Sequence, residues 1–141
     1  MGAGMIKASG VNHIALKISE VARSRNFYEG LLGLTIVPFP EMDREQAMNF
    51  RNRVVTKYGV SAPTGGIWLA AGATQLHLIV TPGKREGVIN PFGPHVAFDV
   101  ENFGETRRAL QEKGIEFLEA PSGRQLWILD PDGNTVELRT E

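Results

Sequence analysis

The sequence predicts an α+β protein made of two βαβββ modules, and three observations support this prediction. A weak internal repeat aligns residues 11–37, VNHIALKISEVARSRNFYEGLLGLTIV, with residues 93–118, GPHVAFDVENFGETRRALQEKGIEFL. Each copy is followed by two alternating apolar stretches joined by a turn. The connection between them, TPGKREGVINPFGP, holds three prolines and three glycines. We expect one domain over residues 8–141, with modules 10–80 and 93–140, because each half alone is too small to bury its sheet.

The first module begins with a strand in VNHIALKI and continues into a helix. Ser19 is the expected N-cap, Tyr28 and Leu32 lie on the apolar face, and Gly33 suits the left-handed position after the last turn. Two strands, IWLA and TQLHLIV, then flank the turn AGA at residues 71–73.

The second module repeats this order with shorter connections. Its strand PHVAFDV leads to a helix over residues 103–113, which Gly114 ends. The last two strands, QLWIL and TVELRT, flank DPDGN at residues 130–134, a run dense in turn-forming residues.

The two modules differ in length because of a polar insertion in the first. His13 and His77 are 64 residues apart, whereas His95 and Glu137 are 42 apart. The surplus lies in residues 38–66, where we expect a short helix at 43–49. Such an insertion either shapes a substrate pocket or is a solvated decoration, and the sequence favours neither.

The composition excludes several classes of function. The chain has 141 residues, a net charge of −1 and no cysteine, so it offers no basic surface for nucleic acid, no disulfide and no thiolate ligand. No apolar run is long enough to span a membrane, and the N-terminus lacks a signal-peptide pattern. We expect a cytoplasmic protein whose partner is a small molecule.

Strand alternation places all three histidines and one glutamate on the polar faces of four strands. In each strand the neighbouring apolar residues face the helices, so the opposite face carries His13, His77, His95 or Glu137. A single histidine in such a strand is often bonded to a backbone carbonyl, but three together indicate a shared role. Three imidazoles and one carboxylate suit a divalent transition metal: Zn, Fe(II) or Ni, with Mn and Co as further candidates.

The sequence resembles the vicinal oxygen chelate superfamily, which includes glyoxalase I, extradiol dioxygenases and bleomycin-binding proteins. The resemblance spans residues 11–140 and rests on NHIALKI, NFYEGLLGL, LHL, PHVAF and LWILDPDGNTVEL, the last being the most specific. It is nearest to small glyoxalase-I-like proteins. The resemblance implies a cupped mixed β-sheet of eight strands with helices on the outer face, one metal ion held by His13, His77, His95 and Glu137, and a homodimer.

The resemblance also implies an activity. We expect a metal-dependent lyase or isomerase that acts on a small α-oxygenated substrate through a metal-chelated enediolate, with Glu137 as both ligand and catalytic base. Glyoxalase I enzymes usually have glutamate where this chain has His77, which removes one candidate base. An extradiol dioxygenase, which generally needs an additional histidine, and a non-catalytic drug-binding protein are the alternatives.

Four further residues are candidate substrate contacts. Arg51, Arg53 and Arg124 could bind an anionic group or be ordinary surface charges. Trp127 alternates with Gln125 and Leu129, so it either faces the cup or packs as a structural tryptophan.

Overall fold

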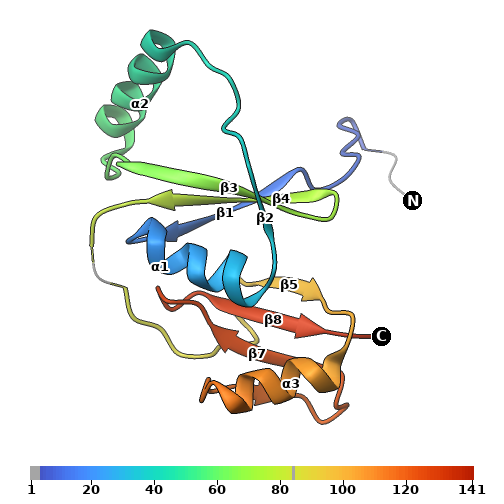
Figure 1. Ribbon diagram of the computed structural model, residues 1–141. Helices are drawn as coiled ribbons and strands as arrows, with labels where there is room; N and C mark the ends of the chain where they lie inside the picture. Colours follow the sequence, from blue (N-terminus) through green and yellow to red (C-terminus); the bar gives the residue numbers. More distant parts are fainter. Residues whose placement is uncertain (1–3, 84) are drawn as a thin grey trace.

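The computed structural model describes residues 4–83 and 85–141 and consists of two four-stranded mixed sheets, with α1 between them and α3 beyond the second sheet (Figure 1). The first module contains β1 (His13–Ile18), α1 (Val21–Arg25), η1 (Asn26–Leu31), β2 (Thr35–Val37), α2 (Arg44–Tyr58), β3 (Gly65–Ala71) and β4 (Thr74–Val80). The second contains β5 (Val96–Asp99), α3 (Phe103–Glu112), β6 (Leu118–Glu119), β7 (Gln125–Leu129) and β8 (Thr135–Arg139). The predicted α+β class and the repeated βαβββ order are confirmed.

The two sheets have the same topology. The strand orders are β1-β4-β3-β2 and β5-β8-β7-β6, with β1 parallel to β4 and β5 parallel to β8. The described strands form neither one continuous sheet nor a closed barrel, and β1 and β5 each lie at an edge of their sheet. No helix in the described ranges is long and apolar enough to cross a membrane.

The apolar faces of the strands form one hydrophobic core with the helices. Leu76 and Leu78 of β4 are buried, as alternation predicts, and Val136 and Leu138 are their counterparts on β8. These side chains belong to a single cluster that draws on both modules. The opposite faces are left free for polar side chains.

The start of the first helix differs from its prediction. Glu20, not Ser19, is the N-cap residue of α1, and it makes no side-chain capping bond. Ser19 instead donates its hydroxyl to Asp132 Oδ1 at 2.6 Å, and its backbone N–H donates to the same oxygen at 3.1 Å. The prediction was wrong because a partner 113 residues away, which local pattern does not reveal, binds the serine. Gly33 has φ 74° and ends the helical segment as predicted.

A buried hydrogen bond joins the helix of the first module to the last turn of the second. The Tyr28 hydroxyl, fully buried, donates to Asp130 Oδ2 at 2.7 Å. Burial, together with the charge of Asp130, raises the pKa of Tyr28, so the hydroxyl stays protonated and remains a donor. Asn134 also donates its side-chain amide to the Lys17 carbonyl at 3.1 Å. These contacts connect β1 and η1 to the DPDGN turn.

The inserted helix α2 is longer than predicted. The expected segment was 43–49, but the helix runs from Arg44 to Tyr58. Asp43 caps it by accepting from Gln46 N at 2.9 Å, and Gly59, with φ 67°, ends it. No glycine or proline interrupts these 15 residues, so the helix continues to the next stop signal. None of its residues is buried, and it projects away from the sheets (Figure 1).

Residues 85–94, hereafter the strap, pack on the turn between β7 and β8. A Cβ atom at Gly133 would lie 2.7 Å from Gly87 N, so only glycine allows this approach. The Asn90 N–H donates to Thr135 Oγ1 at 3.1 Å and fixes the strap to β8. The strap therefore holds a defined position up to the start of β5.

Replacing Tyr28 by phenylalanine should weaken the link between the modules. The variant leaves the ring in place but deprives Asp130 of one donor, so the free energy of unfolding should fall by about 1.5–3 kcal/mol. Urea denaturation measures this change. Tyr58→Phe is the matched control, because Tyr58 is 66% exposed and its replacement should leave stability unchanged. Equal stability of both variants would contradict a stabilising role for the Tyr28 hydrogen bond.

Candidate metal centre

The first half-site consists of His13, His77 and Trp68 on neighbouring strands. The imidazole of His77 stacks on Trp68 with ring centroids 4.0 Å apart and planes at 11°. His13 meets the edge of Trp68 at 5.0 Å, and the two imidazole centroids are 6.5 Å apart. Phe39, at the start of the insertion, meets His77 edge-on at 6.3 Å. The aromatic rings thus restrict the orientations of both imidazoles.

The second half-site consists of His95, Glu137 and Trp127. His95 Nε2 lies 3.0 Å from Glu137 Oε1, and Trp127 Nε1 donates to the same oxygen at 3.1 Å. Glu137 Oε2 accepts from Gln125 Nε2 at 3.3 Å and lies 3.6 Å from Arg139 Nη1. The carboxylate is only 5% exposed, and its hydrogen bonds offset the cost of burying its charge.

Strand register explains why each half-site contains a tryptophan. Trp68 is paired directly with His77 across β3 and β4, and Trp127 is paired with Glu137 across β7 and β8. The two cross-strand rows are Ala15, His77 and Trp68, and Ala97, Glu137 and Trp127. The sequence analysis missed Trp68. Trp68 lies opposite His77 in the first module just as Trp127 lies opposite Glu137 in the second. The internal repeat could therefore have revealed Trp68.

The two half-sites shift the pKa of their histidines in opposite directions. In the second, the hydrogen bond between His95 Nδ1 and the Gly93 carbonyl, 2.8 Å, raises the pKa of His95, and Glu137 adds to this effect. In the first, burial lowers the pKa of His77, and the nearby charge of His13 lowers it further. His77 therefore remains a neutral imidazole, the form that binds metal, to lower pH.

The four predicted ligands come together as two pairs. Within residues 4–83 and 85–141, no group of three or more His, Cys, Asp or Glu is close enough to hold one metal ion. One pair, His13 and His77, offers two imidazoles, and the other, His95 and Glu137, offers an imidazole and a carboxylate. Each pair has the right donor types and held orientations, but neither has the three or four ligands that transition-metal sites use.

Of the four candidate substrate contacts, the three arginines are exposed and Trp127 belongs to the second half-site. Arg51 and Arg53 are exposed on α2, where the Arg53 guanidinium lies 5.6 Å from the ring centroid of Phe50. Arg124 is exposed just before β7. Trp127 is half-buried, and its indole N–H is used by Glu137, so it orients a predicted ligand.

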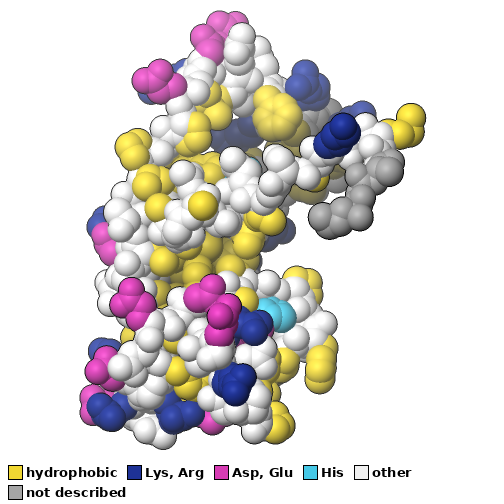
Figure 2. All heavy atoms as spheres, turned by 90° about the vertical axis from the view of Figure 1, so that its right-hand side faces the viewer, with side chains coloured by type: hydrophobic (Ala, Val, Ile, Leu, Met, Phe, Trp, Pro, Cys, Tyr) yellow, Lys and Arg dark blue, Asp and Glu magenta, His cyan; other side chains and the backbone are white. Residues whose placement is uncertain are grey.

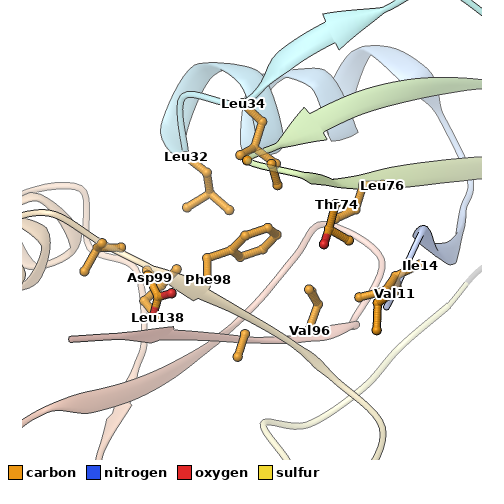
Figure 3. A pocket seen from close by; sticks show the side chains of 14 residues that line it. Val11, Ile14, Leu32, Leu34, Thr74, Leu76, Val96, Phe98, Asp99 and Leu138 are labelled. Atoms are coloured by element: carbon orange, nitrogen blue, oxygen red, sulfur yellow. The ribbon is translucent and has the colours of Figure 1, made fainter. Parts of the chain in front are cut away.

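A hollow of about 520 Å³ separates the modules but is distinct from both half-sites. Its lining comes mainly from the apolar sides of the strands, with Ala97 and Asp99 from the other side of β5, and Phe98 projects into its middle (Figure 3). Figure 2 shows the surface hollowed between the two halves, with a histidine side chain near acidic and basic groups on the lower half. Residues of β1 and β5 line the hollow. These two strands are edge strands of separate sheets and do not pair with each other. The lining residues include Val11, Ile14, Leu34, Leu76, Val96, Phe98 and Leu138.

Comparison with known proteins identifies the family. The family model of the Glyoxalase/Bleomycin resistance protein/Dioxygenase superfamily matches residues 10–138. The chain therefore belongs to this superfamily, as its motifs indicated.

Individual relatives are distant but cover most of the chain. The chain is 28% identical over 138 residues to Glyoxylase I 4 of Arabidopsis thaliana, covering 91% of this chain and 68% of that protein. It is 27% identical to the metallothiol transferase FosB of Staphylococcus haemolyticus, covering 96% and 85%. A putative glyoxalase family protein from Bacillus anthracis has the same fold, with a TM-score of 0.69, 22% identity and coverage of 98% and 99%.

The histidines of the metal-free protein should titrate in a defined order. NMR titration of the imidazole resonances should give His95 a higher pKa than His77, because His95 is bonded to a carbonyl and a carboxylate while His77 is buried beside another imidazole. In Glu137→Gln the pKa of His95 should fall, while that of His77 should not change. The reverse order in the parent protein would contradict the two half-site geometries.

Proposed function

We propose that this protein is a metal-dependent lyase or isomerase of the glyoxalase-like type, with a centre completed between two copies of the chain. His13 and His77 of one copy and His95 and Glu137 of the other would hold one ion. The observation that carries this proposal is the division of the four ligands into two preformed pairs on separate sheets.

The unpaired edge strands support assembly from two chains. In the described part of the chain, β1 has only β4 as a strand neighbour, and β5 has only β8. Exposed edges of this kind are usually covered or paired in native proteins. If β5 of a second copy lies along β1, its His95 and Glu137 come beside His13 and His77. Two-fold symmetry then gives two equivalent centres and covers the β1 and β5 edges of each chain.

The donor set fits a divalent transition metal. Three imidazole nitrogens and one carboxylate oxygen suit Zn, Fe(II) or Ni, and also Mn or Co, while leaving room for substrate oxygens. When bound, such an ion supplies Lewis acidity to two neighbouring oxygens of a substrate. Trp68 and Trp127 hold the ligands in place before binding, so little conformational entropy is lost.

Glu137 is the residue best suited to move a proton. It is the one carboxylate among the four predicted ligands, and Trp127 and His95 both hold Oε1. Oε2 has the longer contact, 3.3 Å to Gln125, and is the freer oxygen. Glu137 would accept a proton from the substrate carbon next to the bound oxygens and return it to the adjacent carbon, which is an isomerisation.

The relatives favour catalysis over simple binding. The names of the similar proteins from Arabidopsis and Staphylococcus denote a glyoxalase and a transferase, both enzymes. A non-catalytic drug-binding protein would have no use for a buried carboxylate paired with a histidine. An extradiol dioxygenase would generally need another histidine, and the chain has only three.

Complementation between two inactive variants tests the proposal. His77→Ala removes a ligand from the first half-site, and His95→Ala removes one from the second, so each protein alone should bind little metal. When the two are co-expressed, about half of the dimers are mixed, and each mixed dimer has one intact centre. Metal content by elemental analysis should therefore recover to about a quarter of the parent value, and any activity on 2-oxoaldehydes with thiols should return with it.

The matched control co-expresses His77→Ala with His13→Ala. Both substitutions damage the first half-site, so no mixed dimer has an intact centre and no recovery is expected. Failure of His77→Ala and His95→Ala to complement, in a parent protein that binds stoichiometric metal, would show that each chain builds its own site. A parent protein that binds no divalent metal would refute the proposed function.

A further inference from the structure

The insertion between β2 and β3, residues 38–64 and hereafter the arm, exposes an unusual amount of apolar surface. In the described ranges, twelve large apolar side chains are exposed, and half of them lie on this segment, about a fifth of the chain. They are 49–72% exposed: Phe39, Met42, Met48, Phe50, Tyr58 and Val60. Single exposed apolar residues are normal, but such a concentration marks an interaction surface.

The arm begins at the first half-site and extends outward as a capped helix. Phe39 contacts His77, so the arm starts beside a predicted ligand. Helix α2 is capped at both ends by Asp43 and Gly59 and is about 22 Å long at 1.5 Å per residue. None of its residues is buried. A polar helix with well-formed caps but no buried residue is poorly stabilised unless another surface covers it.

A second exposed apolar pair lies on the strap, which leads along the chain to His95 of the other half-site. Val88 and Phe92 of the strap are 79% and 98% exposed. The backbone of Phe92 is nevertheless held in place, because its N–H donates to Asn90 Oδ1 at 3.0 Å and the Asn90 N–H donates to Thr135 Oγ1. It lies three residues before His95, whose imidazole contacts the Gly93 carbonyl. A phenylalanine on a held backbone and in full contact with water gains free energy when a partner covers its ring.

We propose that the arm of one copy docks on the strap of a second copy and closes over the shared centre. This inference rests on the proposed function, because the two surfaces meet only if the two half-sites do. Ligand atoms lie about 2.0–2.2 Å from a bound metal, so His77 of one copy and His95 of the other would be within a few ångströms. Phe39 contacts His77 and Phe92 is three residues from His95, so the same arrangement would bring Phe39 and Phe92 toward each other. Helix α2 extends from Phe39 and would lie across the strap.

A second copy fits the arm better than a membrane does. Residues 50–58 carry three cations and no acid, which would suit an anionic lipid surface, but Glu41, Asp43 and Glu45 precede them. The exposed apolar residues also occur at both half-sites rather than on α2 alone. A second copy that covers both half-sites accounts for both groups with a single partner.

The absence of cysteine in the sequence permits a direct cross-linking test. Met48→Cys and Phe92→Cys chains, carrying different tags, are co-expressed, purified as mixed dimers and treated with a short bis-maleimide. A covalent dimer that joins the two tags is expected. The matched control replaces Met48→Cys with Leu118→Cys, which lies on β6 and is similarly exposed at 47%, and it should give no cross-link with Phe92→Cys.

Truncation supplies an independent readout of the same contact. Phe92→Ala should raise the dimer dissociation constant, measured by sedimentation, by about tenfold or more, because buried aromatic residues dominate interface affinity. Leu118→Ala should leave it unchanged. Phe92 is not one of the four predicted ligands. A weaker dimer in Phe92→Ala would therefore not be explained by the loss of a metal ligand.

The outcomes separate this inference from the proposed function. Restored metal in the complementation experiment without a cross-link between Met48→Cys and Phe92→Cys would overturn the arm contact alone. A cross-link without metal binding would support the arm contact and overturn the proposed function. Cross-linking of Met48→Cys chains to each other, or binding of the parent protein to phosphatidylserine vesicles that Phe50→Ala abolishes, would show that the arm has another partner.

Discussion

The buried hydrogen bond between Tyr28 and Asp130, at the edge of the core that both modules share, is the contact on which the placement of the modules depends most clearly. With Ser19 bound to Asp132 and Asn134 bound to Lys17, it attaches the β1–η1 region of the first module to the last turn of the second. The two sheets are thereby placed side by side without sharing a strand pair. The same arrangement leaves the edges of β1 and β5 open and keeps the two ligand pairs on separate sheets. This geometry is the basis of our proposal that a second copy completes the metal centre.

The modules use the same backbone rows for different chemistry. In both modules a predicted ligand lies directly opposite a tryptophan on the next strand. In the first module the indole of Trp68 stacks on the imidazole of His77, whereas in the second the indole N–H of Trp127 donates to the carboxylate of Glu137. In the proposed centre, the first module would offer two imidazole ligands, and the second would supply the negative charge and the proton acceptor. A centre built from one half of each copy combines a strong Lewis acid with a base, which neither half provides alone.

The sequence predicted what local periodicity encodes and missed what depends on distant contacts. Alternation placed His77 and Glu137 on the faces opposite the core, and glycine and turn signals located both hairpins correctly. Ser19 was assigned to a cap because its partner, Asp132, is remote in sequence. The inserted helix was predicted too short because its polar composition hid its length, although Gly59 marked its end. The division of the ligands into pairs could not be predicted, because it depends on how two modules pack and not on any pattern within one.

The central claim is that one metal ion bridges two chains. The most direct measurement is a crystal structure of the metal-loaded protein with anomalous scattering data collected at the absorption edge of the bound metal. The account predicts one anomalous peak per chain, bonded to His13 and His77 of one copy and to His95 and Glu137 of the other. A peak bonded to all four residues of a single chain, or peaks at neither pair, would contradict it.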